Sequence, residues 1–204
     1  EAYPHQVVKT GEEKVSITFK NGEPVALNGQ EMAPVALIHA LAEIANGYGI
    51  GRDIHIGDTI IGIKGRVGFE AAAPLMIIKA HHLLEKHVLV KEQLYWKELI
   101  ANYYGQLMHE AQYLNPVMRD MEKFLESTQS SVNGTVDVLL RPYNFFVLGC
   151  TSEYDLMSST FGEYGAMNKT YPGKDVVGFT KVLSNPLKIY YSLHEDEKEK
   201  ASKN

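Results

Sequence analysis

The sequence predicts an α+β fold, a small mixed or antiparallel sheet packed with several long helices. Residues 15–19 show the two-residue alternation of a half-buried strand, and residues 135–140 also favour a strand. Between them lie longer segments whose apolar residues recur at helical spacing. Strands grouped at both ends, with helices between them, argue against repeated strand–helix–strand units.

The N-terminal region predicts two strands joined by a tight turn. In residues 15–19, apolar Val15, Ile17 and Phe19 alternate with polar residues, as in a strand with one buried face. Asn21-Gly22 then favours a two-residue hairpin turn into a second strand, which Asn28-Gly29 ends. The preceding residues 1–13 are polar and irregular, and we expect a linker or arm there.

Four helices are expected next. The first covers residues 32–46, with one apolar face, and the second begins near Pro74, with an apolar stripe up to His87. The third covers residues 91–113, and the fourth begins where Asn115 can cap the helix and Pro116 can occupy its first position. The apolar faces of the first two comprise Val35, Ile38, Leu41, Ala42 and Ala45, and Leu75, Ile78, Leu83 and Leu84.

The C-terminal third predicts two more strands and a final helix. Residues 135–140 and 145–148 favour strands, residues 151–173 a loop, and residues 174–193 a helix that bends or stops at Asn185-Pro186. The last residues, 194–204, are a charge run with no large apolar side chain to bury, which predicts a flexible tail. We therefore expect one domain, residues 14–193, with an arm before it and a tail after it.

Composition narrows the functional classes. A net charge of −5 and a pI near 5.9 argue against a nucleic-acid partner. No apolar run approaches the roughly 18 residues that a membrane span needs, so no membrane partner is expected. One cysteine, Cys150, excludes an internal disulfide and favours the cytoplasm. Because the sequence begins at Glu1 rather than at methionine, we expect a piece of a longer protein.

A glycine-rich segment, GIGRDIHIGDTIIGIKGRVGFEAAAP at residues 49–74, contains the candidate site. Such dense glycines between β-branched residues predict a bulged hairpin. Ile60, Ile61 and Ile63 require burial, so the hairpin is expected to have an inner face. Its polar residues, His55, Asp58, Lys64, Arg66 and Glu70, form either a binding site for a zwitterionic amino acid or a surface ion network.

Other residues with possible chemistry have simpler interpretations. No phosphate-loop, dinucleotide or metalloprotease motif is present in the sequence, and no catalytic residue or metal site is predicted. A metal site formed by His81, His82, His87 and His109 is disfavoured. Adjacent histidines on a helix point in different directions, so His81 and His82 cannot both face the same ion. Cys150 is interpreted as an inert thiol rather than a nucleophile. The third helix is rich in aromatic residues, and we expect them to pack against other helices or subunits rather than to stack on a ligand. They are Tyr95, Trp96, Tyr103, Tyr104 and Tyr113.

The order of several short blocks resembles one known family. GIGR, GIKGR and FEAAAP are followed by IIKAHHLLE, TQSSVNGTVDVLL and DVVGFTKV. Together they resemble the C-terminal half of argininosuccinate synthases, and the resemblance covers nearly the whole chain. It implies that family's C-terminal fold, which completes the citrulline pocket and assembles a homotetramer.

The resemblance also implies a reaction. Argininosuccinate synthases use ATP to condense citrulline with aspartate, which yields argininosuccinate, AMP and pyrophosphate during arginine biosynthesis. ATP and Mg are bound mainly by an N-terminal domain whose phosphate loop is not in this sequence, so the chain alone is expected to be inactive. The protein in this chemistry mainly positions substrates and stabilises charge.

Two hairpin positions depart from the family pattern, which binds citrulline through a glutamate and a tyrosine. Here those positions are Gly57 and Phe69. Asp58 could replace the carboxylate if a bulge at Gly57 swings it across. The expected citrulline-side contacts are Asp58, Arg66, Phe69, Glu70, His55 and Gly57. Three alternatives remain open, namely a related ligase for a modified citrulline, a non-catalytic oligomerisation domain and a separate binding module.

Overall fold

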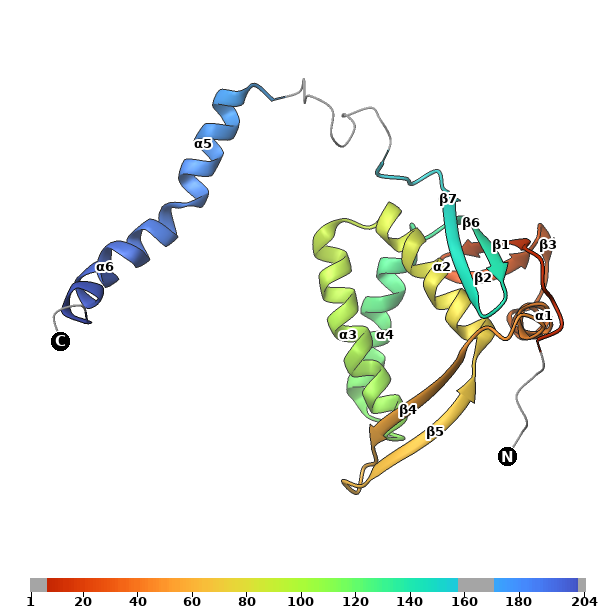
Figure 1. Ribbon diagram of the computed structural model, residues 1–204. Coiled ribbons are helices and arrows are strands. Elements are labelled where there is room, and N and C mark those ends of the chain that lie inside the picture. The colour runs from red at the N-terminus through yellow and green to blue at the C-terminus, as the bar shows by residue number, and fades with distance from the viewer. Residues whose placement is uncertain (1–6, 158–170, 202–204) are drawn as a thin grey trace. The chain divides into compact units, whose positions relative to one another are not determined.

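The computed structural model describes residues 7–157 and 171–201, with side chains described as far as His194. Within these ranges the chain forms two compact units, which divide between Leu156 and Met157. Figure 1 labels their helices and strands. The division of the chain into an arm, a domain of residues 14–193 and a tail stays a prediction.

The first unit is built on a five-stranded sheet with the strand order β3-β2-β1-β6-β7. Every neighbouring pair in it is antiparallel, which confirms the predicted sheet. The strands are β1 (Glu13–Lys20), β2 (Glu23–Leu27), β3 (Gln30–Glu31), β6 (Gly134–Arg141) and β7 (Asn144–Thr151). The first and last parts of this unit therefore meet at the centre of one sheet.

Local sequence explains the β1–β2 hairpin. Val15, Ile17 and Phe19 are buried at alternate positions, as the two-residue period predicts. Asn21 and Gly22 both have positive φ angles, 49° and 79°, which match the type I′ turn of a two-residue hairpin. The turn also contacts a neighbouring loop, since Gly22 N donates to Val132 O at 2.9 Å.

Two helices complete the main core beside the sheet. They are α1 (Pro34–Asn46) and α2 (Ala72–Val88), and α2 packs against β6 and β7. Met76, Ala80 and Leu84 of α2 are fully buried in the same cluster as Ile17 and Val136. Small alanines on this face allow α2 to approach the sheet closely.

The predicted apolar faces of α1 and α2 were partly wrong. In α1 the buried residues are Leu37, Leu41 and Ala45, whereas Val35 is 67% exposed. In α2 the expected Leu75 and Ile78 are 39% and 55% exposed. Both helices have apolar residues on more than one side, so helical spacing alone does not identify the side that faces the sheet.

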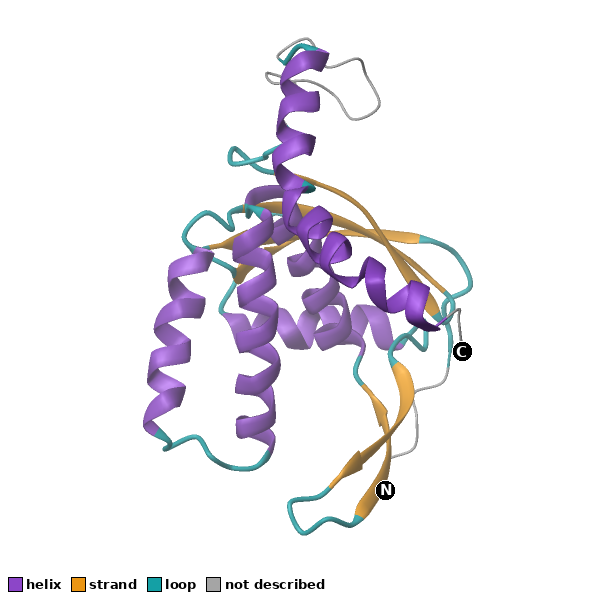
Figure 2. Cartoon of the chain, turned by 90° about the vertical axis from the view of Figure 1, so that its left-hand side faces the viewer, coloured by secondary structure: helices purple, strands orange, loops and turns teal. Residues whose placement is uncertain are grey.

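Two further helices, α3 (Lys91–His109) and α4 (Pro116–Gln129), form a helical hairpin, which Figures 1 and 2 show side by side. They share a second apolar cluster of Leu107, Met118 and Met121. The predicted cap of α4 is confirmed, because Asn115 Oδ1 accepts from Val117 N at 3.2 Å. Helix α3 ends at His109, earlier than predicted, and Ala111 follows with a φ of 58°.

The glycine-rich segment forms a separate two-stranded hairpin of β4 (Arg52–Asp58) and β5 (Lys64–Glu70). Figures 1 and 2 show it extending away from the main sheet. The predicted burial of its isoleucines was wrong, since Ile60, Ile61 and Ile63 are 71%, 75% and 61% exposed. No other helix or strand of the described ranges packs extensively on the hairpin, so nothing there covers these residues.

The second unit contains α5 (Gly173–Leu183) and α6 (Asn185–Ala201). Its helices are separated at Ser184, which confirms the stop predicted at Asn185-Pro186. Helix α6 continues through residues predicted to form a flexible tail, where Glu, Lys and Ala favour helix. Residues 158–170, most of the predicted loop, lie outside the described ranges. None of the described helices has the length and apolar character to cross a membrane.

Candidate functional site

The predicted site residues lie on two opposite faces of the β4–β5 hairpin. Its antiparallel register is continuous, from Arg52 opposite Glu70 to Asp58 opposite Lys64. Because side chains alternate across a strand and cross-strand partners share a face, the register assigns every residue to one face. The hairpin therefore has a charged face and an aromatic face, each with its own chemistry.

The charged face contains two cross-strand ion pairs. Lys64 Nζ lies 2.8 Å from Asp58 Oδ2, and Arg52 Nε lies 3.0 Å from Glu70 Oε1. Arg66 is on this face too, between Lys64 and Gly68 on β5. The Lys64–Asp58 pair is well exposed, so the attraction between its charges adds little to stability.

The aromatic face contains His55 opposite Val67, Gly57 opposite Gly65 and Asp53 opposite Phe69. The two opposed glycines contribute no side chains to the distal third of this face. The His55 imidazole folds toward that gap, since its Nε2 lies 2.6 Å from the position of a Cβ on Gly57. This face thus combines an aromatic ring, an imidazole and two half-buried glycines.

The six predicted contacts are therefore divided into two sets of three. Asp58, Arg66 and Glu70 belong to the charged face, and His55, Gly57 and Phe69 belong to the aromatic face. The bulge expected at Gly57 does not occur, because β4 and β5 pair without a register shift. Asp58 consequently stays on the charged face beside Lys64. Sequence reasoning lacked two facts, namely that β4 continues through Gly57 without a bulge and that the register brings Phe69 onto the face of Gly57.

The base of the hairpin is fixed to the start of α2. Gly51 has a φ of 83°, and a Cβ there would lie 2.6 Å from the backbone nitrogen of Ala72. Gly51 O accepts a hydrogen bond from Ala71 N at 2.9 Å. Glycine at this position allows a tight chain reversal against a neighbouring backbone.

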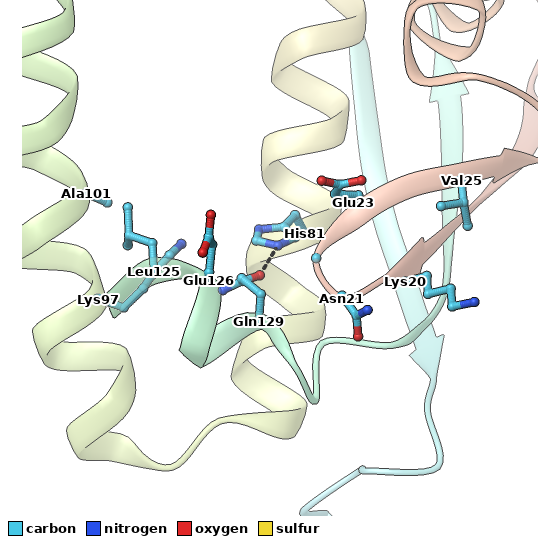
Figure 3. Close-up of a pocket in the computed structure, with 11 residues that line it drawn as sticks. Lys20, Asn21, Glu23, Val25, His81, Lys97, Ala101, Leu125, Glu126 and Gln129 are labelled. Atoms are coloured by element: carbon cyan, nitrogen blue, oxygen red, sulfur yellow. Dashed lines mark hydrogen bonds between the residues drawn. The ribbon is translucent and has the colours of Figure 1, made fainter. Parts of the chain in front are cut away.

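A pocket of about 670 Å³ lies elsewhere in the first unit, where the β1–β2 turn meets the helices. Figure 3 shows His81 from α2, Lys97 from α3 and Gln129 from α4 among its lining residues. Burial lowers the pKa of His81 below its ordinary value. The described ranges contain no group of three or more His, Cys, Asp or Glu residues that could hold a metal ion.

Other residues singled out from the sequence are dispersed. His87 Nδ1 lies 3.0 Å from Asp155 Oδ1, and burial together with Asp155 raises the pKa of the Cys150 thiol. A raised pKa disfavours the thiolate, which supports the interpretation of Cys150 as unreactive. Tyr104 lies against the α3–α4 cluster, whereas Trp96 and Tyr103 are more than half exposed.

A family model described as "Arginosuccinate synthase C-terminal domain" matches residues 3–190. The chain belongs to the argininosuccinate synthase family. This confirms the family predicted from the order of the sequence blocks, and the observed α+β arrangement agrees with it.

Argininosuccinate synthases of known sequence resemble the chain over most of its length. That of Dictyoglomus turgidum is 38% identical over 176 residues, 86% of this chain and 44% of the relative. Those of Methanocaldococcus jannaschii and Synechococcus elongatus are each 37% identical over 88% of this chain and 45% of the relative. The chain thus spans about half the length of the relatives that it matches.

Proposed function

We propose that this chain acts as the C-terminal domain of an argininosuccinate synthase-like ligase in the cytoplasm. The ligase joins citrulline to aspartate and converts ATP into AMP and pyrophosphate. The ureido oxygen of citrulline bonds to the α-phosphorus and displaces pyrophosphate. The aspartate amine then bonds to the ureido carbon, loses a proton and displaces AMP. Family membership over residues 3–190 supports this proposal.

The nucleotide belongs to the other half of such a ligase. The described ranges contain no cluster of acidic and imidazole groups for a metal, and the sequence has no phosphate loop. ATP and Mg would be bound mainly by the N-terminal half of such a ligase, and no step of the reaction is assigned to this chain through them. The chain contributes the hairpin and takes part in a homotetramer, and alone it is inactive.

One observation supports the hairpin as the citrulline side. Gly57 and Phe69 stand at the two positions where the family pattern has its citrulline-binding glutamate and tyrosine. They come from different strands, yet the register places both on the aromatic face. Two residues that bind one small substrate must share a face, and these two positions do.

His55 is the better candidate than Asp58 to compensate for the missing carboxylate. Its imidazole lies on the aromatic face, with Nε2 2.6 Å from the position of a Cβ on Gly57. Asp58 lies on the charged face and is paired with Lys64. A neutral imidazole donates one hydrogen bond and accepts another, so His55 could bind either the ureido group or the carboxylate of a citrulline.

A modified citrulline is the second candidate substrate. His55 covers the Gly57 side of the Gly57–Gly65 pair, but on the Gly65 side the nearest side-chain atom, Thr59 Cγ2, lies 3.9 Å from the position of a Cβ. That side leaves space for a group larger than the free α-amine of citrulline. An acyl group on that amine would remove a positive charge as well as add bulk. The same hairpin would then bind an N-acylated citrulline in place of citrulline.

Pyrophosphate release tests the proposal in the complete ligase, with this chain joined to a nucleotide-binding half. The assay supplies ATP, aspartate and in turn citrulline, an N-acylated citrulline and shorter ureido acids. Turnover with citrulline supports the first proposal, and turnover restricted to the acylated compound supports the second. Failure with every ureido acid would favour a non-catalytic oligomerisation domain, and tight binding of a ureido acid by this chain alone would favour a binding module.

A further inference from the structure

The first unit has two separate apolar clusters. The main cluster lies between the sheet, α1 and α2, and the second lies between α3 and α4. Apart from the contact with each other, neither α3 nor α4 packs extensively on another described helix or strand. Apolar burial therefore holds the helical hairpin together but contributes little to its attachment. Leu94 is the α3 residue that packs against the main cluster.

A buried polar cluster joins the helical hairpin to α2. Glu85 of α2 is 1% exposed. Its Oε2 lies 2.8 Å from Lys97 Nζ of α3, and its Oε1 accepts from Gln129 Nε2 of α4 at 2.9 Å. One carboxylate of α2 thus contacts both helices of the hairpin, and we call this set, with His81, the Glu85 cluster.

His81 completes the cluster with a defined tautomer. Both Nε2 hydrogens of Gln129 are donated, to Glu85 and to Thr128 Oγ1, so its Oε1 is the acceptor. His81 Nε2 lies 2.8 Å from that oxygen and must be the donor. Its Nδ1 faces Glu85 Oε2 at 3.7 Å. Figure 3 shows the His81–Gln129 bond in the wall of the pocket.

We propose that the Glu85 cluster fixes the orientation of the α3–α4 hairpin relative to α2 and the sheet. Hydrogen bonds and ion pairs depend on direction, whereas apolar contacts tolerate sliding. A buried ion pair adds little net stability, because desolvation offsets the attraction, but it can select one arrangement among several. Here the arrangement selected sets the direction of the exposed row of Tyr95, Trp96 and Tyr103 on α3.

The pocket supports this assignment. It lies where α2, α3, α4 and the β1–β2 turn meet, and His81, Lys97 and Gln129 line it. The helical hairpin consequently has open volume beside its attachment and could change its angle without expelling core residues. The β1–β2 turn limits that movement on one side, since a Cβ on Gly22 would lie 2.2 Å from Gln129 Oε1.

The test measures orientation and stability separately in the full chain. Spin labels at Glu31→Cys and Asn102→Cys, with Cys150→Ser, report the distance between the sheet and α3. Lys97→Met removes the lysine cation from the Glu85 carboxylate, and Glu85→Gln with Lys97→Met removes both charges. Lys14→Met is the matched control, because Lys14 Nζ also lies 2.8 Å from its partner, Asp137 Oδ2, but the pair is exposed.

The two Lys97 variants give distinct expected results. Lys97→Met lowers stability and broadens the distance distribution, because a buried charge loses its partner. The double variant recovers the stability but keeps the broad distribution, and amide exchange in α3 and α4 is faster by about tenfold or more relative to α2. The proposal would be overturned if the double variant had the narrow distribution of spin-label distances seen in the Lys14→Met control. A broad distribution in that control would overturn it too.

Discussion

His81 on α2 contacts Gln129 of α4, and burial is the largest influence on its pKa and lowers it below 6.5. The Glu85 carboxylate and the hydrogen bond to Gln129 act in the opposite direction but do not cancel it. The folded protein therefore prefers the neutral imidazole, and protonation favours the unfolded chain.

This shift gives a signed dependence of stability on pH. Above pH 6.5 His81 is neutral in both states, and its stabilising contribution is fully present. As pH falls from 6.5 toward the lowered pKa of the folded state, the unfolded chain binds a proton first and stability decreases. We expect His81→Gln, which retains a side-chain N–H donor, to flatten this decrease in urea unfolding measured between pH 7.5 and 5. An equally steep decrease in the variant would contradict the assignment to His81.

Two neighbouring hairpin residues should differ in their effect on substrate binding. His55→Ala removes the imidazole from the aromatic face and should raise KM for the ureido substrate by about 10- to 100-fold, because a hydrogen bond to a buried ligand group is lost. Asp58→Ala breaks an exposed ion pair on the charged face and should change KM by less than about twofold. Initial rates of pyrophosphate release in the complete ligase measure both, and the reverse ranking would identify Asp58 as the substrate contact.

Among the structural elements, the β4–β5 hairpin depends most on one glycine at its base. Gly51 and Gly62 both have positive φ angles, 83° and 77°. A Cβ on Gly51 would collide with the backbone of Ala72, whereas a Cβ on Gly62 would have no atom within 4 Å. The same substitution at these two positions therefore separates backbone strain from steric collision.

Gly51→Ala should lower the free energy of unfolding by about 3 kcal/mol or more, because strain and a rigid backbone collision add. Gly62→Ala should cost about 1–2 kcal/mol, which is the strain alone. Urea unfolding followed by far-UV circular dichroism measures both values. Equal losses would mean that the base of the hairpin moves freely away from α2.

Local signals predicted the elements, and contacts between elements decided what was missed. Asn21-Gly22 and Asn115-Pro116 act within a few residues, so the turn and the helix start were correct. Val35 and Ile78 were predicted to be buried but are exposed. Which side of a helix meets the sheet decides this, and helical spacing alone does not specify that side. The separation of His55 from Asp58 follows from β4 continuing through Gly57 without a bulge, so that side chains alternate. The pairing of Phe69 with the face of Gly57 follows from the strand register, which the bond from Thr59 N to Ile63 O helps to set. The substrate-contact roles remain predictions.

At the scale of the whole molecule, apolar side chains remain uncovered in both units. In the hairpin Ile56 and Val67 are more than half exposed, and in the second unit so are Phe179 and Leu187. Helix α5 has no buried residue at all. Exposed apolar side chains in such numbers are characteristic of interaction surfaces, which agrees with the proposed homotetramer.

Trp96 is the single tryptophan of the sequence and can report that assembly. Its side chain is 56% exposed and makes an edge contact with Tyr95. We expect iodide to quench its fluorescence readily in the dilute chain and about two- to threefold less in the assembled protein, because a subunit contact excludes water. Size-exclusion chromatography with light scattering identifies the species measured. Unchanged quenching on assembly would mean that the α3 row faces solvent in the tetramer.

The central position of β1 has a consequence for synthesis of the chain. Its partner β6 is distant in sequence, and the hydroxyls of Thr18 and Thr135, 3.0 Å apart in the sheet, are separated by 117 positions. A ribosome adds about 5–20 residues per second, so β1 waits roughly ten seconds for β6 to emerge. During that interval the inner edge of β1 is an open template for pairing with other nascent chains. The strand order thus leaves one edge of β1 unpaired until residues 134–141 have been synthesised.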